Sequence, residues 1–307
     1  MVFEASARHL NFSKAAEELS ITQPAVSHGI RQLEASLAQL LFVRERRALK
    51  LTSHGQRLFA SVSGSLTAIA DTVDEISGAP QRNVVVVSTS TVMANEWLLP
   101  RLPLLREHDP TLIIDLRCTD RDPDLTADGI DLHIRIGDGN WPGYETSRLW
   151  RETINCICSP EYLQRYGPIT LPSDLLEHRL VHYVDAHRYR LGWGEWFRAS
   201  GISVPLSLPT TLKVNDSLLA LRASENGEGI SLGTRPVIDR SLASGLTVLA
   251  HPNVVTTGRY FYSVSVYNSS RRRHIALFRD WLTEQVRQFD ENQLPTKAGD
   301  RMDSQEH

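Results

Sequence analysis

The chain has 307 residues, 41% of them hydrophobic and 22% charged, which is the composition of an ordinary folded protein. No apolar run approaches the ~20 residues that a membrane-spanning helix needs. Charged side chains near the N-terminus argue against a secretory signal, and an odd number of cysteines favours reduced thiols in the cytoplasm. The length suggests two domains.

The charge is unevenly distributed along the chain. Residues 1–57 contain eight Lys and Arg against five Asp and Glu, whereas residues 58–307 contain 25 against 31. The N-terminal part is therefore basic and the remainder acidic, although the whole chain carries a net charge of only −3. This asymmetry is expected of a nucleic-acid-binding module joined to a second, acidic domain.

Two amphipathic helices are predicted between residues 12 and 37. The first is expected to be capped by Ser13, and its apolar residues are Phe12, Ala15, Ala16 and Leu19. The second is expected to begin at Thr22, with Pro24 in its first turn, where the missing N–H removes no helix bond. Its apolar stripe consists of Val26, Ile30, Leu33 and Leu37.

The opposite face of the second helix is polar and suits contact with DNA bases. Its members are Gln23, Pro24, Ser27, His28 and Arg31. Arginine pairs well with guanine and glutamine with adenine, while serine tolerates either. Two helices joined by a three-residue turn, the second with its polar edge outward, predict a helix-turn-helix. An ordinary solvated helix face is the alternative.

Residues 58–80 predict a linker helix. Apolar residues recur there at intervals of three and four, namely Leu58, Val62, Leu66, Ile69, Val73 and Ile76. A narrow stripe at that spacing favours packing against another helix, so we expect this segment to mediate dimerisation. The alternative is a helix packed on its own domain.

Beyond residue 80, strands and helices alternate, which predicts an α/β domain with largely parallel sheets in two lobes. Strands are expected at "NVVVVSTST", "TLIIDLRC", "DLHIRIG", "NCICSP", "HRLVHYVD", "GISLG", "LTVLA" and "YFYSVSVY". Helices are expected at about 96–108, 123–128, 216–225 and 272–288. The domain should span 81–290, with lobe I at about 81–155 and 260–290, lobe II at about 156–259, and a disordered tail at 291–307.

The basic N-terminal part, residues 1–57, is called the head. It resembles the DNA-binding module of LysR-type transcriptional regulators across "ARHLNFSKAAEELSITQPAVSHGIRQLE" and "LLFVRERRALKLTSHGQ". Later motifs, "LPRL", "GNWPG" and "CSP", are similar to the subgroup of the glycine-cleavage activator. The resemblance implies a winged helix-turn-helix over residues 1–57, in which the polar face is the recognition surface. "RERRALK" would be the wing, with Arg44, Arg46 and Arg47 suited to phosphate contact.

Two positions in the head depart from the family pattern. Gly29 stands inside the recognition helix, where it lowers helix propensity by ~1 kcal/mol. Ala38 replaces the usual glycine before the wing and is strained if that turn needs a positive φ. The chain also begins about ten residues late relative to the family, which would shorten the first helix.

Hydroxyl and carboxylate groups gather at two predicted helix starts in the second domain. Ser90 and Thr91 follow a strand, and Asp216 and Ser217 precede a helix. Free backbone N–H groups and hydroxyls at such places suit an anion, or the side chains serve only as helix caps. The resemblance implies that the effector binds between two periplasmic-binding-protein-like lobes, and it adds Gly137 to the candidate effector-binding residues. A carboxylate at Asp216 suggests a ligand that also carries a cationic group, such as an amino acid.

Two other functions are compatible with parts of the sequence. "GISLG" fits the G-x-S-x-G pattern of hydrolases, which would make Ser231 the nucleophile of a serine esterase. The acidic domain alone could be a cytoplasmic solute-binding protein, but that role leaves the basic head unexplained. No Cys/His group has zinc spacing, and no glycine-rich phosphate loop is present.

The sequence therefore predicts a cytoplasmic transcriptional regulator that binds promoter DNA and is controlled by a small-molecule effector. We expect no catalytic residues, metal, cofactor or membrane contact. A homodimer or homotetramer should act on an inverted repeat, because symmetric proteins bind symmetric half-sites. RNA polymerase is a further candidate partner.

Overall fold

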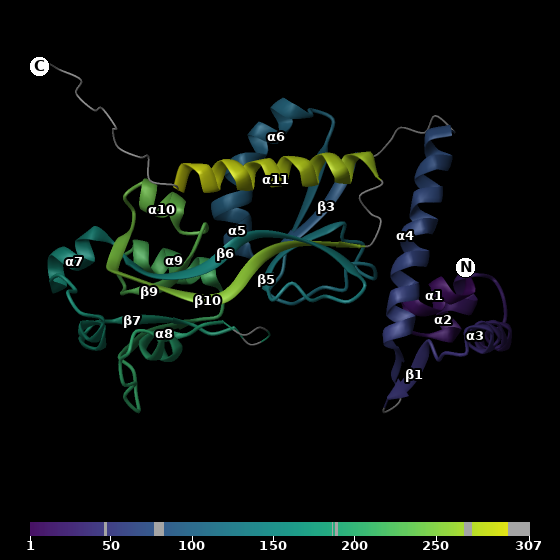
Figure 1. The fold of residues 1–307 in the computed structure, drawn as a ribbon, viewed down its shortest axis with the longest axis horizontal. Helices are drawn as coiled ribbons and strands as arrows, with labels where there is room; N and C mark the ends of the chain where they lie inside the picture. Colours follow the sequence, from purple (N-terminus) through teal and green to yellow (C-terminus); the bar gives the residue numbers. More distant parts are fainter. Residues whose placement is uncertain (46–47, 77–82, 186, 188–189, 267–271, 294–307) are drawn as a thin grey trace, which may run out of the picture.

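The computed structural model describes residues 1–45, 48–76, 83–185, 187, 190–266 and 272–293. The head consists of three short helices and a hairpin, followed by one long helix (Figure 1). These elements are α1 (Val2–His9), α2 (Phe12–Glu18), α3 (Gln23–Leu37), β1 (Phe42–Glu45), β2 (Ala48–Leu51) and α4 (Ser53–Ile76). The predicted winged helix-turn-helix is thus present.

The head is held together by one small apolar core. Phe42, at the start of the hairpin, meets the edges of Phe3 and Phe12 at ring-centroid distances of 5.8 and 5.3 Å. Val26 and Ile30 of α3 are buried in the same core. Leu37, predicted on that buried stripe, is instead 46% exposed, because the last turn of α3 extends past the core residues that cover Val26 and Ile30.

Side-chain caps define where the two helices of the motif begin. Asn11, rather than the expected Ser13, caps α2, because its Oδ1 accepts hydrogen bonds from the backbone N–H groups of Ser13 (2.9 Å) and Lys14 (3.2 Å). Thr22 caps α3, and Pro24 lies in the first turn as predicted.

Helix α4 leaves the head as a single 24-residue helix. Gly55 allows its first turn to approach the wing, since a Cβ there would lie 2.1 Å from the carbonyl oxygen of Leu41. Leu58 and Val62 pack against the head core. Farther along the helix, Ile69 and Val73 are 59% and 54% exposed.

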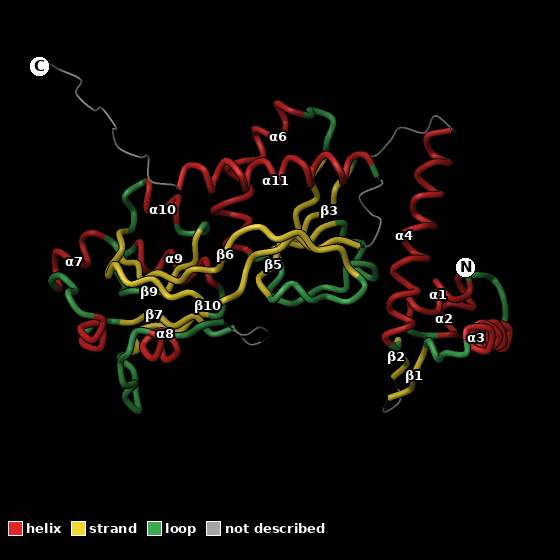
Figure 2. Tube along the Cα trace, in the orientation of Figure 1, coloured by secondary structure: helices red, strands yellow, loops and turns green. Residues whose placement is uncertain are grey.

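The second domain is built on a six-stranded sheet in the order β4-β3-β5-β10-β6-β9 and a two-stranded sheet β7-β8 (Figure 2). The strands are β3 (Val84–Thr89), β4 (Ile113–Cys118), β5 (Leu132–Gly137), β6 (Tyr144–Cys158), β7 (Leu180–Tyr183), β8 (Thr210–Val214), β9 (Ser231–Arg235) and β10 (Val248–Val266). Strand β3 is parallel to β4 and β5, and β7 is parallel to β8. The expectation of largely parallel sheets is wrong for the rest, because β10 runs antiparallel to β5 and β6, and β6 runs antiparallel to β9.

Two strands are much longer than predicted. Strand β6 has 15 residues, of which only the last few were expected, and β10 joins into 19 residues what looked like two separate strands. Register shifts between Leu249 and Tyr262 interrupt the pairing of β10 with β6, and Gly258 has a φ of 78°. These irregularities let one strand continue through a polar stretch that reads as a loop.

The helices of this domain are α5 (Thr91–Met93), the π-turn η1 (Ala94–Leu98), the 3₁₀-turns η2 (Leu99–Arg101) and η3 (Pro172–Glu177), α6 (Leu102–His108), α7 (Pro160–Tyr166), α8 (Trp193–Ala199), α9 (Ser217–Glu225), α10 (Asp239–Ala243) and α11 (Arg273–Gln293). None of the helices in the described residues is long and apolar enough to span a membrane.

Two of the helix predictions need correction. The helix expected at 123–128 is a turn. The Asp124 carboxylate accepts hydrogen bonds from the backbone N–H groups of Thr126 and Ala127, and Gly129 then reverses the chain at a φ of 61°. Helix α11 reaches Gln293, so the first residues of the expected disordered tail are helical. The remainder of that tail, 294–307, lies outside the described residues.

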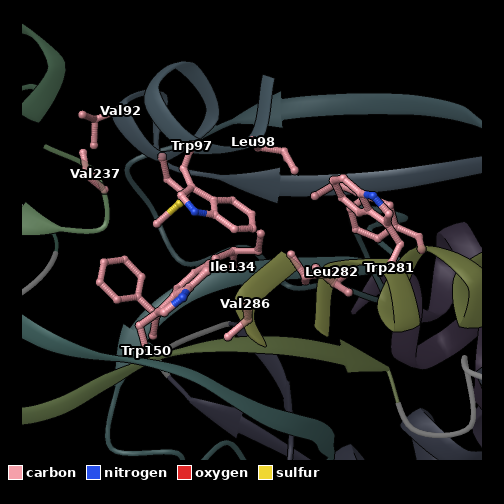
Figure 3. Packing of buried hydrophobic residues seen from close by; sticks show 14 of the residues in the cluster. Val92, Trp97, Leu98, Ile134, Trp150, Val237, Trp281, Leu282 and Val286 are labelled. Atoms are coloured by element: carbon pink, nitrogen blue, oxygen red, sulfur yellow. The ribbon is translucent and has the colours of Figure 1, made fainter. Parts of the chain in front are cut away.

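Two apolar cores give the domain its two lobes. The larger core gathers Trp97, Trp150 and Trp281 between the sheet and α11 (Figure 3). The second contains Trp196 and Phe197 of α8. Both long strands pass between the cores, β6 from Trp150 to Ile154 and β10 from Val255 to Phe261, and Ile157 farther along β6 packs again in the larger core. A site between the lobes therefore lies beside these crossings.

Candidate DNA-binding and effector sites

The recognition helix α3 exposes the polar face that the sequence predicts. Gln23, Pro24, His28 and Arg31 are exposed and Ser27 is half-buried. The Gln23 side chain donates a hydrogen bond from Nε2 to the Ser27 hydroxyl (2.8 Å), which aligns two polar groups along the helix. The polar face is accessible because Val26 and Ile30 hold the other face of α3 in the core of the head.

The wing lies beside the C-terminal half of this face. Arg44 is exposed on β1, opposite Leu49 in the hairpin. A shallow surface pocket is lined by Ser27 and Arg31 of α3 together with Arg44. The predicted wing residues Arg46 and Arg47 lie outside the described residues. Helix and wing thus form one surface with exposed cations.

Glu34, which sequence reasoning missed, fixes the wing to the recognition helix. Its Oε1 accepts hydrogen bonds from the backbone N–H groups of Leu41 (2.8 Å) and Phe42 (3.1 Å). Thr52, at the far end of the hairpin, donates from its hydroxyl to the carbonyl oxygen of Leu40 (2.7 Å). The only sequence signal for this role is a carboxylate one turn before the end of α3.

The turn between α3 and the wing contains the strain anticipated at Ala38. Its φ of 51° and ψ of 32° are left-handed, a conformation that favours glycine. Gly29 is not needed for space, since a Cβ there would meet only Val2 Cγ1 at an ordinary contact distance of 3.5 Å. Both departures from the family pattern therefore act against the stability of α3.

A cavity of about 110 Å³ lies between the two lobes. Lobe I contributes Ser90, Val92, Ile136 and Phe261, and lobe II contributes residues from β7, α9, β9 and the segment before α8. Glu152 and Ile154 line it from the crossing segment of β6. A ligand in this cavity would touch both lobes and one of the strands that join them.

Two of the predicted effector residues, Ser90 and Ser217, line this cavity. Ser90 caps α5, because its hydroxyl oxygen accepts a hydrogen bond from the backbone N–H of Met93 (3.4 Å). Ser217 is the first residue of α9. The N-termini of two helices, one from each lobe, therefore meet at the cavity, although each hydroxyl lies at a place where a helix cap is also expected.

The other predicted effector residues do not line the cavity. Asp216 caps α9, because its carboxylate accepts hydrogen bonds from the backbone N–H groups of Leu218 (2.8 Å) and Leu219 (3.2 Å). Gly137 makes room for Trp141, whose Cζ2 would lie 2.4 Å from an added Cβ. Thr91 begins α5, next to the lining residue Ser90. Asp216 therefore acts as a helix cap, and Gly137 leaves the space that Trp141 fills.

Ionisable side chains on the cavity wall were not predicted. Glu152 is 2% exposed, and the hydroxyl of Thr257 donates to its Oε2 (2.5 Å). Burial lowers the pKa of His182, with a smaller effect from the nearby Lys213. Burial also raises the pKa of Tyr183 to about 12. The imidazole and the phenol are therefore neutral near pH 7 and can offer hydrogen bonds.

Ser231 also lines the cavity, but from inside a strand. It is 1% exposed on β9 and accepts a hydrogen bond from the Ser224 hydroxyl (2.7 Å). His251, a later histidine in chain order, contacts the carbonyl oxygen of Thr170 (3.2 Å) and accepts from the N–H of Asn253 (3.0 Å). The strand-to-helix turn and the serine–histidine contact of a hydrolase are not formed by these residues.

Two family descriptions match the chain in the places that the fold suggests. "Bacterial regulatory helix-turn-helix protein, lysR family" covers residues 1–56, and "LysR substrate binding domain" covers residues 78–287. The chain belongs to the LysR family of transcriptional regulators. It therefore combines a DNA-binding helix-turn-helix with an effector-binding domain of the LysR type.

Several LysR-family relatives are similar along nearly their full length. The glycine cleavage system transcriptional activator of Escherichia coli (strain K12) is 32% identical over 281 residues, or 92% of this chain and 90% of that protein. The transcriptional activator AmpR of Pseudomonas aeruginosa is 33% identical over 282 residues, or 92% of this chain and 93% of that protein.

Solved LysR-type structures have the same fold. The effector domain of AmpR from Pseudomonas aeruginosa covers 69% of this chain and all of its own, with a TM-score of 0.58 and 26% identity. The full-length regulator LysG from Corynebacterium glutamicum, with bound effector Arg, covers 94% of this chain and 96% of its own. Its TM-score is 0.70 at 16% identity, so this similarity shows a shared fold only.

Proposed function

We propose that the cavity between the lobes is the effector site and that its occupant changes how the heads bind promoter DNA. The observation that supports this most directly is the lining, which comes from both lobes and from the crossing segment of β6. A ligand that contacts both lobes stabilises one arrangement of the lobes over others by its difference in affinity. Such a shift can be transmitted to the DNA-binding head as a coupling free energy.

We assign two kinds of DNA contact to the head. Gln23, Ser27 and Arg31 on the exposed edge of α3 would read bases in the major groove, with Pro24 and His28 beside them. Arg44, together with Arg46 and Arg47 in the predicted wing, would bind phosphates, which adds affinity that depends on salt but little on sequence.

We further propose that two or four copies assemble on an inverted repeat. Ile69 and Val73 on α4 are exposed at the spacing of one helical turn, as a helix pairing surface requires. Residues 1–57 would form the head, 58–80 the linker, and 81–290 the effector domain. Because the assembly would bind promoter DNA, we propose that it acts in the cytoplasm, where RNA polymerase is a candidate partner.

Filling the cavity tests the effector site. In Ser217→Phe a bulky ring would occupy the space beside α9, so compounds that stabilise the protein in a thermal-shift screen of amino acids and organic acids should no longer do so. A ligand at a hundredfold excess over its Kd raises the free energy of unfolding of the protein by about 2.7 kcal/mol.

Leu219→Phe is the matched control, because Leu219 lies on the same helix and is 53% exposed. This variant should keep the full response to the ligand. If Ser217→Phe also keeps it, the effector binds elsewhere and the proposed site is wrong.

A further inference from the structure

Glu96 is a buried carboxylate of lobe I that meets arginines of lobe II, the part of the chain between the two strand crossings. Its side chain is 2% exposed. Its Oε1 accepts a hydrogen bond from Nη2 of Arg222 on α9 (2.6 Å), and its Oε2 lies 3.8 Å from Nη1 of Arg240 on α10. A buried carboxylate is unfavourable unless a positive group pairs with it. Glu96 therefore depends on the other lobe for its counter-charge.

Arg222 binds acceptors on both sides of the boundary between the lobes. Its Nη2 also donates a hydrogen bond to Asn95 Oδ1 of lobe I (3.1 Å), whereas its Nη1 donates to Glu225 Oε2 within α9 (2.6 Å). The second oxygen of Glu225 accepts a hydrogen bond from the Ser241 hydroxyl (2.7 Å). The planar fork of arginine suits such a shared position. One edge of the guanidinium is thus bound to lobe I while the other is held by lobe II.

The two helical segments that Arg222 connects both begin at the cavity. Ser90 caps α5, which contacts α9 and continues into η1 with Glu96, and Ser217 is the first residue of α9. The segment η1 is a π-turn, an irregularity that occurs frequently at functional sites. A displacement of one lobe relative to the other therefore changes both the distance between the helix starts and the Glu96–Arg222 contact.

We propose that the Glu96–Arg222 ion pair is a lock that holds the two lobes in the arrangement of this structure when no effector is bound. This inference rests on the proposed function for its regulatory meaning, because there the arrangement of the lobes controls the head. The lobes are otherwise joined by β6, β10 and apolar contacts such as that of Leu221, which is buried in the larger core. Apolar contacts are non-directional and permit sliding, whereas charged hydrogen bonds fix one position.

The test is the distance between two spin labels in the full-length protein, measured by pulsed electron paramagnetic resonance without added ligand. The labels are attached at Asp280→Cys on α11 for lobe I and at Gln164→Cys on α7 for lobe II, both exposed positions. Cys118 is exposed and is replaced by serine, whereas Cys156 and Cys158 are buried. Co-expression with an excess of unlabelled chain limits the signal to distances within one chain.

Glu96→Gln preserves the shape of the side chain but removes its charge. It should increase the population of a second lobe arrangement, seen as a second set of distances, by about tenfold or more, because an ion pair with a buried carboxylate is lost. Arg222→Gln should produce the same second set, and it keeps the test decisive if Glu96→Gln does not fold.

Glu225→Gln is the matched control. Glu225 lies at the same distance from Arg222 and its side chain is 7% exposed, but it belongs to the same helix, so its ion pair cannot hold one lobe to the other. Its distances should match those of the unmodified protein. If both Glu96→Gln and Arg222→Gln leave the distances unchanged, or if Glu225→Gln changes them equally, the ion pair only adds stability and the inference is overturned.

Binding to the promoter duplex separates this inference from the proposed function. Without ligand, Glu96→Gln should change the affinity for that duplex and Glu225→Gln should not. If the distances change but the affinity does not, the lock stands and the proposed coupling between lobes and head is wrong. If the distances stay unchanged while Ser217→Phe abolishes the ligand response, the cavity is the effector site and the lock is wrong.

Discussion

Ala38 and Glu34 lie where the recognition helix gives way to the wing, and they affect that junction in opposite directions. Glu34 ties two backbone N–H groups of the wing to α3. Ala38 adopts a left-handed conformation that disfavours any residue with a Cβ by roughly 1–2 kcal/mol. The orientation of the wing is thus maintained by a half-buried carboxylate, Glu34, against a strained turn at Ala38.

Replacing Ala38 by glycine should relieve this strain. We expect Ala38→Gly to stabilise α3 by about 1 kcal/mol and to slow amide hydrogen exchange in the last two turns of the helix. Exchange is the suitable measurement, because all six tryptophans lie outside the head and fluorescence would not report on it. Ala35→Gly, the same change inside the helix, should accelerate exchange instead. Equal effects from both variants would refute this explanation.

Glu18 should titrate at an unusually low pH. A two-point contact with Arg8 (2.5 and 2.9 Å), followed by a bond from His9 (2.6 Å), lowers its pKa from 4.5 to about 2. Because the folded pKa is the lower one, the contact stabilises the head fully above pH 4.5, and this stabilisation is lost as the pH falls towards 2.

A carbon-13 NMR titration of the glutamate carboxyl groups measures this directly. The Glu18 resonance should have its midpoint near pH 2, and Arg8→Gln should move the midpoint back towards 4.5. A midpoint near 4.5 in the unmodified protein would show that the cluster does not form in solution.

At the scale of elements, local patterns predicted the head well and the long strands poorly. Thr22, Pro24 and the stripe of Val26 and Ile30 are all local signals, and α3 has them where expected. Strand β10 contains a polar stretch with a positive-φ glycine, Gly258, and its continuity depends on pairing with β6, which is distant in sequence. Periodicity cannot detect such pairing.

The candidate effector site illustrates the same limit. Ser90 and Ser217 could be nominated because helix starts are visible in a sequence. Glu152 could not, since it looks like an ordinary charged residue until the fold buries it beside the cavity. Burial is a property of the tertiary structure, so the sequence alone does not distinguish this carboxylate from an exposed one.

The exposed stripe of α4 leads to a prediction about assembly. Ile69→Lys combined with Val73→Lys would place two charges where we propose that another copy packs, so the protein should dissociate to smaller species in analytical ultracentrifugation. Leu206→Lys is the control, because that side chain is fully exposed in a loop and should tolerate the change. An unchanged sedimentation coefficient in the double variant would show that assembly uses other surfaces.

At the scale of the whole molecule, the regulation that we propose links two separate places, the basic head and the cavity between the lobes. The cavity touches both lobes, and the head presents polar side chains on one edge of α3 and a cation, Arg44, on the wing. Control of transcription by this chain requires that α3 distinguish DNA sequences, because otherwise a signal from the cavity has no specific target.

The most direct measurement compares Arg31→Ala and Arg44→Ala on two duplexes, one carrying the protein's promoter site and one of random sequence, at fixed salt. Arg31→Ala should weaken binding to the promoter by at least tenfold and leave binding to random DNA nearly unchanged, since a base contact contributes about 1–3 kcal/mol of discrimination. Arg44→Ala should weaken both to a similar degree. Equal losses on the two duplexes in Arg31→Ala would contradict the assignment of α3 as the element that reads sequence.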